Sequence, residues 1–135
     1  MTKPTEAEAA LDAAADADTQ PLTLQPTVNS RAEFDALLAK ATGPVLVDFV
    51  QEGCGHCVDE APKFDKLMSE CGSKATLARV EITQDWASQL ADQLKVDGTP
   101  TALLADSAAL FLAGKGREVT DLDSSAVRRK IKCAR

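Results

Sequence analysis

The chain is predicted to be an α/β protein with a central mixed sheet of four to five strands and helices on both faces. One observation is the nearly continuous apolar run VLVDFV at residues 45–50, which is typical of a strand buried on both faces. A second is that apolar stripes at helical spacing alternate with short strand-like runs along the chain. A third is the absence of internal repeats, so a single sheet layered between helices accounts for the whole pattern.

Domain organisation follows from composition. With 44% hydrophobic residues among 135, the chain can build one core without help from metal or disulfides. Residues 1–21 are rich in Ala, Asp and Glu and lack aromatic residues, so we expect a disordered acidic leader. Residues 22–135 then form the domain, and PLTL at 21–24 is a candidate short edge strand at its start.

The elements after the leader are predicted in turn from periodicity and from capping signals. The first helix has a capping-box pair in Ser30 and Glu33, and the helix after the cysteine segment contains Pro62, which is expected to kink it. The predicted order is a helix at 29–44, a strand at 45–50, a helix from about 58, a strand at 75–83, a helix at 85–96, a hairpin of strands at 98–105 and 109–116, and a helix near 122–132.

Charge excludes some functions. The formal net charge is −6, and the residues after position 26 include 16 acidic and 14 basic side chains. Nucleic acid is therefore not expected as a partner, because neutralising phosphates takes clustered Lys and Arg. One basic cluster, at residues 128–132, falls in the last turns of a predicted helix, where it is expected to complement the helix dipole. The sequence contains no run of 18 apolar residues, so no membrane span is predicted.

The segment EGCGHCVDEAP at 52–62 holds two cysteines and the only histidine of the chain. Taken alone, it fits half of a metal site, a structural disulfide or a redox dithiol. Its place between a buried strand and a helix puts Cys54 at the exposed helix start, where the dipole and free N–H groups lower the pKa of a cysteine. Cys57, one turn further on, is expected to be shielded and to resolve a mixed disulfide formed on Cys54.

Several motifs together resemble the thioredoxin family over roughly residues 22–132. They are VLVDFV before CGHC, Ala61-Pro62 after it, the later V-x-G-T-P-T at 96–101, and Gly116. The resemblance implies a thioredoxin fold and a thiol–disulfide oxidoreductase that needs no cofactor and no metal. It also implies protein thiols and disulfides as substrates, a partner protein that regenerates the redox pair, and a monomer.

The resemblance assigns further site residues. Asp48 resembles the buried aspartate of the family, a carboxyl with a raised pKa that relays a proton to or from the resolving thiol. Arg79 occupies the place of a family lysine and is expected to keep Asp48 ionised, unless it is a plain surface arginine. Pro100 resembles the cis-proline that faces the dithiol, an arrangement that would aim the backbone of Thr99 at a bound peptide.

The dipeptide between the cysteines is Gly55-His56, as in protein disulfide isomerases, where thioredoxins have Gly-Pro. A histidine near the Cys54 sulfur stabilises its thiolate and favours an oxidant or isomerase, as does Thr99 before Pro100. The chain also departs from the family, because Glu52-Gly53 stands where an aromatic residue usually precedes the first cysteine.

Localisation points the other way on the direction of electron flow. The first 21 residues contain no apolar region of a signal peptide, so the chain as written is expected to be cytoplasmic, where a reductant is favoured. A trimmed N-terminus would instead allow a periplasmic or secreted protein. The sequence therefore leaves the direction open.

Cys71 and Cys133 lie outside the motif, and we expect them to be unpaired, with Cys71 buried and Cys133 exposed. Two other functions remain as alternatives. A binding module without turnover is disfavoured because both motif cysteines are present. A zinc protein is disfavoured because structural zinc sites usually use two paired clusters, whereas these two cysteines are isolated singles.

Overall fold

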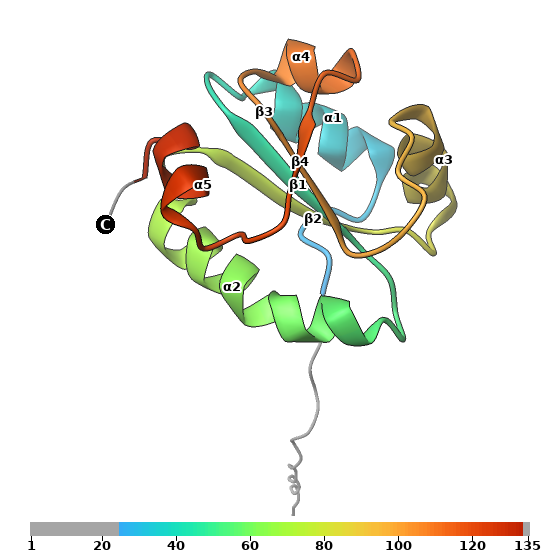
Figure 1. Cartoon of the computed structure of the whole chain (residues 1–135). Helices are drawn as coiled ribbons and strands as arrows, with labels where there is room; N and C mark the ends of the chain where they lie inside the picture. Colours follow the sequence, from blue (N-terminus) through green and yellow to red (C-terminus); the bar gives the residue numbers. More distant parts are fainter. Residues whose placement is uncertain (1–24, 134–135) are drawn as a thin grey trace, which may run out of the picture.

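A four-stranded mixed sheet forms the centre of the computed structural model, which describes residues 25–133 (Figure 1). The strand order is β2-β1-β3-β4. β1 pairs in parallel with β2 and antiparallel with β3, and β3 pairs antiparallel with β4. The strands are β1 (Val45–Val50), β2 (Thr76–Glu81), β3 (Thr101–Ala105) and β4 (Arg117–Val119).

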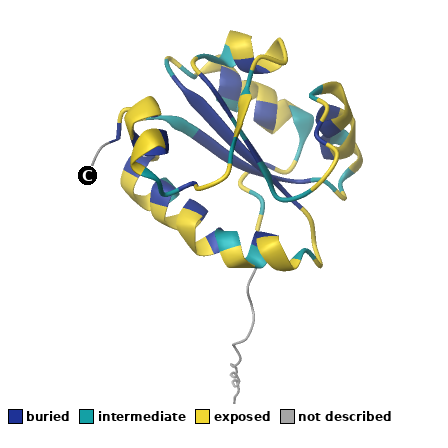
Figure 2. Cartoon of the chain, viewed as in Figure 1, coloured by how far each residue is buried: buried dark blue, intermediate teal, exposed yellow. Residues whose placement is uncertain are grey.

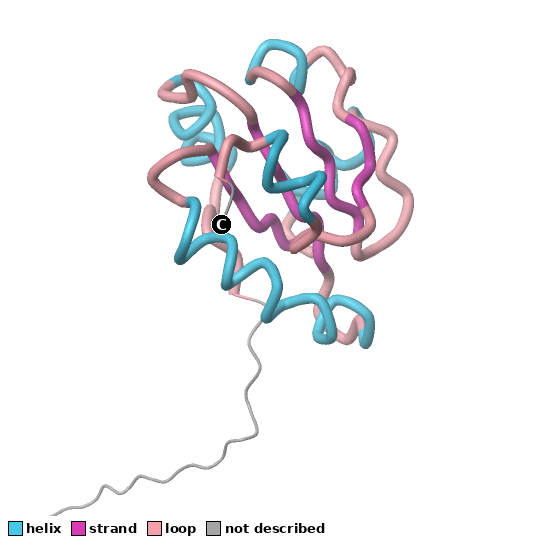
Figure 3. Tube along the Cα trace, turned by 60° about the vertical axis from the view of Figure 1, so that its left-hand side comes forward, coloured by secondary structure: helices cyan, strands magenta, loops and turns pink. Residues whose placement is uncertain are grey.

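Helices cover both faces of this sheet, as the sequence predicts (Figure 3). One core cluster joins residues of α1, α3 and α4 to Val45, Val47 and Phe49 of β1. The other joins residues of α2 and α5 to Leu46 of the same strand. The helices are α1 (Arg31–Ala39), α2 (Gly55–Cys71), α3 (Asp85–Gln93), α4 (Ala108–Leu112) and α5 (Ser125–Lys130).

β1 is the central strand, and all six of its residues are buried (Figure 2). Because side chains alternate between the faces of a strand, Asp48 shares its face with Leu46, the face that α2 and α5 cover. In the register, Asp48 lies opposite Arg79 on β2 and Ala102 on β3. The strand thus places one carboxyl group beneath α2, in a layer that is mostly apolar but also contains the buried Arg79.

The predicted hairpin is only half right. β3 falls within the expected 98–105 strand, but residues 108–112 form helix α4, and the partner strand is β4 at Arg117–Val119. Ser107 caps α4, since its Oγ accepts a hydrogen bond of 3.1 Å from the amide of Leu110. A short apolar run does not by itself separate a strand from a helix, and here Ala and Leu, both good helix formers, follow a capping serine.

Two expectations concern the start of the chain. The acidic leader at 1–21 and the edge strand at 21–24 lie outside the described residues. Within residues 25–133, no helix combines the length and the apolar character that a membrane crossing requires.

Candidate active site

The dithiol lies at the connection between the end of β1 and the start of α2, and the local sequence explains its position. Gly53 has a φ of +83°, a conformation that favours glycine, and the amide of Cys54 donates to the carbonyl of Gln51 at 3.2 Å. This turn brings Cys54 to the N-cap of α2, in extended conformation just before the first helical residue. Cys54 is partly exposed, whereas Cys57 is completely buried.

Cys54 and Cys57 form a disulfide with a Cα–Cα distance of 5.2 Å. The amide of Cys57 donates to Cys54 Sγ at 3.1 Å, so the sulfur takes the role that a serine or aspartate oxygen has at other N-caps. When the bond is reduced, the same amide and the positive end of the helix dipole stabilise a thiolate on Cys54. The arrangement makes Cys54 the accessible sulfur and Cys57 the shielded one.

A shallow groove of about 230 Å³ runs beside the dithiol. We call it the dithiol groove, and its lining residues are His56, Asp59, Glu60, Lys63, Pro100 and Thr120. His56 is exposed, and the Thr99–Pro100 peptide bond, which the sequence predicts to be cis, is cis. The structure thus brings His56 and Pro100, 44 positions apart in sequence, to one surface. A second cavity, of about 310 Å³, is lined by residues of β3, α4, β4 and α5, with none from the dithiol site.

Asp48 is buried on the α2 side of the sheet, with 1% of its surface exposed. Neither of its carboxyl oxygens has a hydrogen-bond partner in the described chain. Burial raises the pKa of Asp48 to about 8, and the neighbouring Glu60 adds to the rise while Arg79 opposes it. At neutral pH the carboxyl is therefore mostly protonated and able to give up its proton with a small rise in pH.

Arg79 differs from both expectations. It is not a surface residue, being 3% exposed, and its charge does not outweigh the burial of Asp48. Its Nη2 donates to Asp65 at 3.0 Å and to the carbonyl of Ala61 at 3.3 Å, and its guanidinium carbon lies 4.8 Å from the ring centre of Phe64. Arg79 thus links β2 to α2 through hydrogen bonds, and its charge is not sufficient to keep Asp48 ionised.

Glu60 is a site residue that the sequence analysis missed. It lines the dithiol groove, yet its Oε2 is buried without a hydrogen-bond partner in residues 25–133. Burial raises the pKa of Glu60, while Asp48, Arg79 and Lys63 lower it. The available signal was helical spacing, since Glu60 lies three residues after Cys57 and four before Phe64, both buried on the inner face of α2.

Glu81 was missed as well, and it braces the loop before the dithiol. It lies at the end of β2 and is 9% exposed. Its carboxylate accepts from the amides of Glu52 and Thr83, each at 3.0 Å, and from the Thr83 hydroxyl. Glu52 itself is exposed, so its backbone rather than its charge contributes to the site.

The expectation that Cys71 and Cys133 are unpaired is wrong. They form a second disulfide, and Cys133 is buried rather than exposed. The pairing escapes the sequence because the two residues are 62 positions apart, and only the packing of α5 against α2 brings them together. In the basic cluster at 128–132, Arg128 is buried, whereas Arg129 and Lys130 in the same last turn of α5 are exposed.

Metal-ligand geometry is not found in the described part of the chain. No group of three or more His, Cys, Asp or Glu side chains between residues 25 and 133 is arranged to hold a metal ion. The zinc alternative also needed free thiolates, whereas all four cysteines are paired as disulfides.

The sequence is similar to one family model and to several known proteins. The family model named Thioredoxin matches residues 25–128. The chain is 36% identical over 75 residues to a thioredoxin of Rhodospirillum rubrum, covering 56% of this chain and 70% of that protein. It is also 36% identical over 104 residues to the protein disulfide-isomerase of Gallus gallus, covering 73% of this chain but only 20% of that protein.

A solved structure agrees on the fold. The X-ray structure of Fasciola hepatica thioredoxin superposes with a TM-score of 0.55 at 23% identity, covering 75% of this chain and 90% of that one. The central sheet and the helices on its two faces are therefore the fold of that protein as well.

Proposed function

Because this chain belongs to the thioredoxin family, we propose that it is a thiol–disulfide oxidoreductase that acts on protein substrates through Cys54 and Cys57. The observation that carries the proposal is the capped sulfur: Cys54 Sγ accepts the Cys57 amide at 3.1 Å at the start of the 17-residue helix α2. A sulfur held there is accessible and stabilised as a thiolate, which is the reactive form in disulfide exchange.

The reaction runs in two exchanges. The Cys54 thiolate attacks one sulfur of a substrate disulfide, forming a mixed disulfide and releasing the other substrate sulfur as a thiolate. Cys57 then loses its proton and attacks Cys54 Sγ, forming the Cys54–Cys57 disulfide and releasing the second substrate sulfur. The substrate is reduced by two electrons, and the dithiol is oxidised by two; the reverse sequence oxidises a substrate dithiol.

Asp48 and Glu60 supply the proton step. An acid–base group works best when its pKa lies near that of its partner, and a pKa of about 8 for Asp48 lies close to the ordinary value of about 8.5 for a cysteine thiol. Asp48 is buried beneath α2, while Glu60 reaches from the dithiol groove to a buried position beside it. In the proposal, Asp48 first passes its own proton to solvent through Glu60, and the ionised Asp48 then takes the proton of Cys57.

Substrate binding is proposed for the dithiol groove. Pro100 and His56 both line it, and His56 lies two residues after Cys54 in the sequence. Thr99, which precedes Pro100, is partly exposed and keeps its backbone free to pair with an extended peptide, a common way in which proteins bind extended chains.

For the direction of electron flow, we propose the oxidising or isomerising side. The Cys54 thiolate accepts a hydrogen bond from the Cys57 amide and lies at the positive end of the α2 dipole. His56 adds an imidazole that lines the groove. Each of these stabilises the reduced form, and a couple with a stabilised reduced form is a stronger oxidant. The chain is 36% identical over 104 residues to a protein disulfide-isomerase. This similarity and the Gly55-His56 dipeptide, which resembles that of protein disulfide isomerases, support the same side.

The test is a glutathione titration of the Cys54–Cys57 pair. The proposal expects a reduction potential near about −180 mV rather than about −270 mV. The variant His56→Pro should shift the potential toward the lower value, and Asp59→Asn, in the same groove, serves as the control that should shift it little. A wild-type value near that of thioredoxins would overturn the proposed direction without touching the reaction itself.

A second experiment tests whether the protein turns over at all. In the variant Cys57→Ser the resolving thiol is absent, so mixing with a disulfide-containing protein such as insulin should trap a mixed disulfide on Cys54, visible in a non-reducing gel. A protein that only binds peptides would give neither the trapped species nor reduction of insulin by the wild type.

A further inference from the structure

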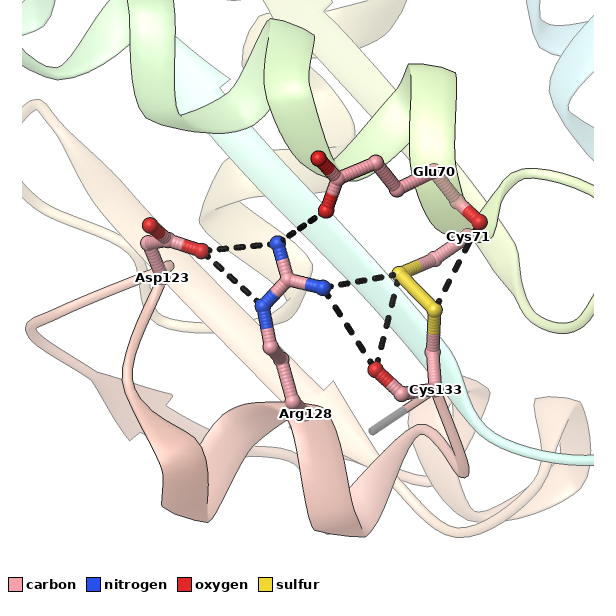
Figure 4. The surroundings of a disulfide bond; sticks show 5 residues. All are labelled: Glu70, Cys71, Asp123, Arg128 and Cys133. Carbon is pink, nitrogen blue, oxygen red and sulfur yellow. Dashed lines mark hydrogen bonds and ion pairs between the residues drawn. A yellow bond between two sulfur atoms is a disulfide. The ribbon is translucent and has the colours of Figure 1, made fainter. Parts of the chain in front are cut away.

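The second disulfide lies outside the dithiol site, at the opposite end of α2. Cys71 is the last residue of that helix, and Cys133 follows α5; their Cα atoms are 5.7 Å apart. Both residues are buried, with exposed fractions of 0% and 3%. Figure 4 shows that one side chain, Arg128 of α5, points directly at this bond.

Arg128 divides its nitrogens between two carboxylates and the disulfide. Nη2 donates to Glu70 at 2.6 Å and to Asp123 at 2.8 Å, and Nε donates to Asp123 at 3.0 Å. Nη1 lies 3.7 Å from Cys71 Sγ and 3.5 Å from the carbonyl oxygen of Cys133. The carboxylates therefore fix a buried guanidinium so that its remaining nitrogen faces the sulfur of Cys71 (Figure 4).

The two sulfurs have unlike surroundings. Cys71 Sγ has a cationic N–H donor, which stabilises a thiolate. It also lies 3.9 Å from the carbonyl of Cys133, but that carbonyl already accepts from Arg128. Cys133 Sγ lies 3.6 Å from the carbonyl oxygen of Glu70, an acceptor that suits a neutral S–H and disfavours a thiolate. On reduction, Cys71 is thus the better leaving group.

The elements that carry the two cysteines also differ in length. Cys71 ends a helix of 17 residues, whereas Cys133 follows a helix of only 6. Helices this short depend on tertiary packing for their stability, so the α5 end opens at lower cost than α2. Local opening therefore exposes Cys133 first.

We propose that the Cys71–Cys133 disulfide is a second thiol-exchange site, at which a small-molecule thiol such as glutathione attacks Cys133 and displaces Cys71. The attacking thiolate bonds to Cys133 Sγ, the Cys71–Cys133 bond breaks, and Cys71 leaves as a thiolate beside Arg128. A second glutathione then attacks the glutathione sulfur of the adduct, releasing oxidised glutathione and the Cys133 thiolate, which takes up a proton. Two electrons pass from two glutathiones to the protein disulfide.

The test uses the full chain with Cys54→Ser and Cys57→Ser, so its outcome does not depend on the proposed function of that pair. The protein is incubated with reduced glutathione under native conditions and quenched with acid. Digestion after glutamate then separates Cys71, in residues 71–81, from Cys133, in residues 119–135. In mass spectrometry, we expect the glutathione adduct on the Cys133 peptide to exceed the adduct on the Cys71 peptide by about tenfold or more. An adduct mainly on Cys71, an even distribution, or no adduct would overturn the proposal.

A matched pair of variants tests the role of Arg128. Arg128→Gln removes the donor to Cys71, and Arg129→Gln removes the same charge from the exposed neighbouring position. The preference for Cys133 should fall toward an even distribution in the first variant and persist in the second. An unchanged preference in a folded Arg128→Gln protein would contradict the assignment.

If Arg128→Gln does not fold, single-cysteine proteins replace it. The remaining thiol at Cys71, with Cys133 changed to Ser, should form a thiolate at lower pH than the remaining thiol at Cys133 with Cys71 changed to Ser, followed by absorbance at 240 nm. The charged groups that face these sulfurs, Arg128, Glu70 and Asp123, are kept in both proteins. The reverse order of titration would refute the proposal.

Discussion

Helix α2 has a disulfide at each end, and the two ends differ in almost everything but the bond. At its start, Cys54 is partly exposed beside a groove, and Asp48, a carboxyl with a pKa raised to about 8, is buried beneath the helix. At its end, both sulfurs are buried against a guanidinium that is held by two carboxylates. A cystine is therefore not sufficient for disulfide exchange with a protein substrate. The sulfur must also be exposed and have an acid–base group nearby.

The largest expected effect is on activity. Cys54→Ser should lower the rate of insulin reduction by at least about 10³-fold, because the nucleophile is lost. Cys133→Ser, at the other end of the helix, should stay within about twofold of the wild type, since distant sites act independently. Circular dichroism of both variants checks the fold. Equal loss in the two folded variants would abolish the distinction between the ends.

The next effect concerns pH and belongs to the start of α2 alone. Asp48 has a pKa of about 8 in the folded protein and about 3.9 when unfolded. The folded state thus holds a proton that the unfolded state has lost, and this contribution is complete below about pH 4 and disappears as the pH rises through 8. It amounts to at most about 6 kcal/mol.

Asp48→Asn removes this dependence, so the variant should gain stability relative to the wild type as the pH rises from 4 to 8. Urea unfolding at a series of pH values measures it, with the exposed Asp59→Asn as control. Parallel pH profiles for wild type and Asp48→Asn would show that Asp48 is ionised in the folded protein.

The two disulfides should also differ in what they contribute to stability. In the chain-entropy account, a bridge across 62 residues stabilises by about 4 kcal/mol and one across 3 residues by about 2 kcal/mol. The double variant Cys71→Ala/Cys133→Ala should therefore lose more free energy of unfolding than Cys54→Ala/Cys57→Ala. Urea denaturation without reductant compares them, and a greater loss in the second variant would reverse the structural ranking of the bridges.

The smallest effect separates Glu60 from its neighbours. Glu60→Gln removes a group that raises the pKa of Asp48 through its charge, so the Asp48 carboxyl should titrate at lower pH while remaining buried. Carbon-13 NMR of that carboxyl follows the change, and Asp59→Asn in the same groove should leave it in place. An unmoved midpoint in Glu60→Gln would separate Glu60 from the proton step.

Local patterns were sufficient for much of the fold. The apolar run at 45–50 determines the central strand because six consecutive buried residues suit few other positions. The turn at Gly53 and the helix after it determine the position of Cys54 from adjacent residues alone. For the central strand and the helix that follows it, the contacts that determine the element lie close together in the sequence.

Contacts between distant segments were not predictable in this way. The Cys71–Cys133 bridge and the burial of Arg128 depend on how α5 packs against α2, which no local pattern reports. Whether Arg79 keeps Asp48 ionised likewise depends on how far burial raises the pKa of Asp48, and burial is a property of the assembled core. At residues 108–112 the error was local, because helix and strand compete for a short apolar run and a serine cap decided the outcome.

The length of α2 has a consequence for the number of chemical species. The 14 residue steps from Cys57 to Cys71 separate the two cystines by about 21 Å along the helix axis, too far for sulfur atoms of one molecule to meet. Electrons can therefore pass from one pair to the other only between molecules or through a diffusing thiol. A single polypeptide then has four redox species, with no, two, two and four alkylatable thiols. A gel-shift experiment with a bulky maleimide would resolve three bands, and the middle band would be a mixture of the two species that have one disulfide reduced.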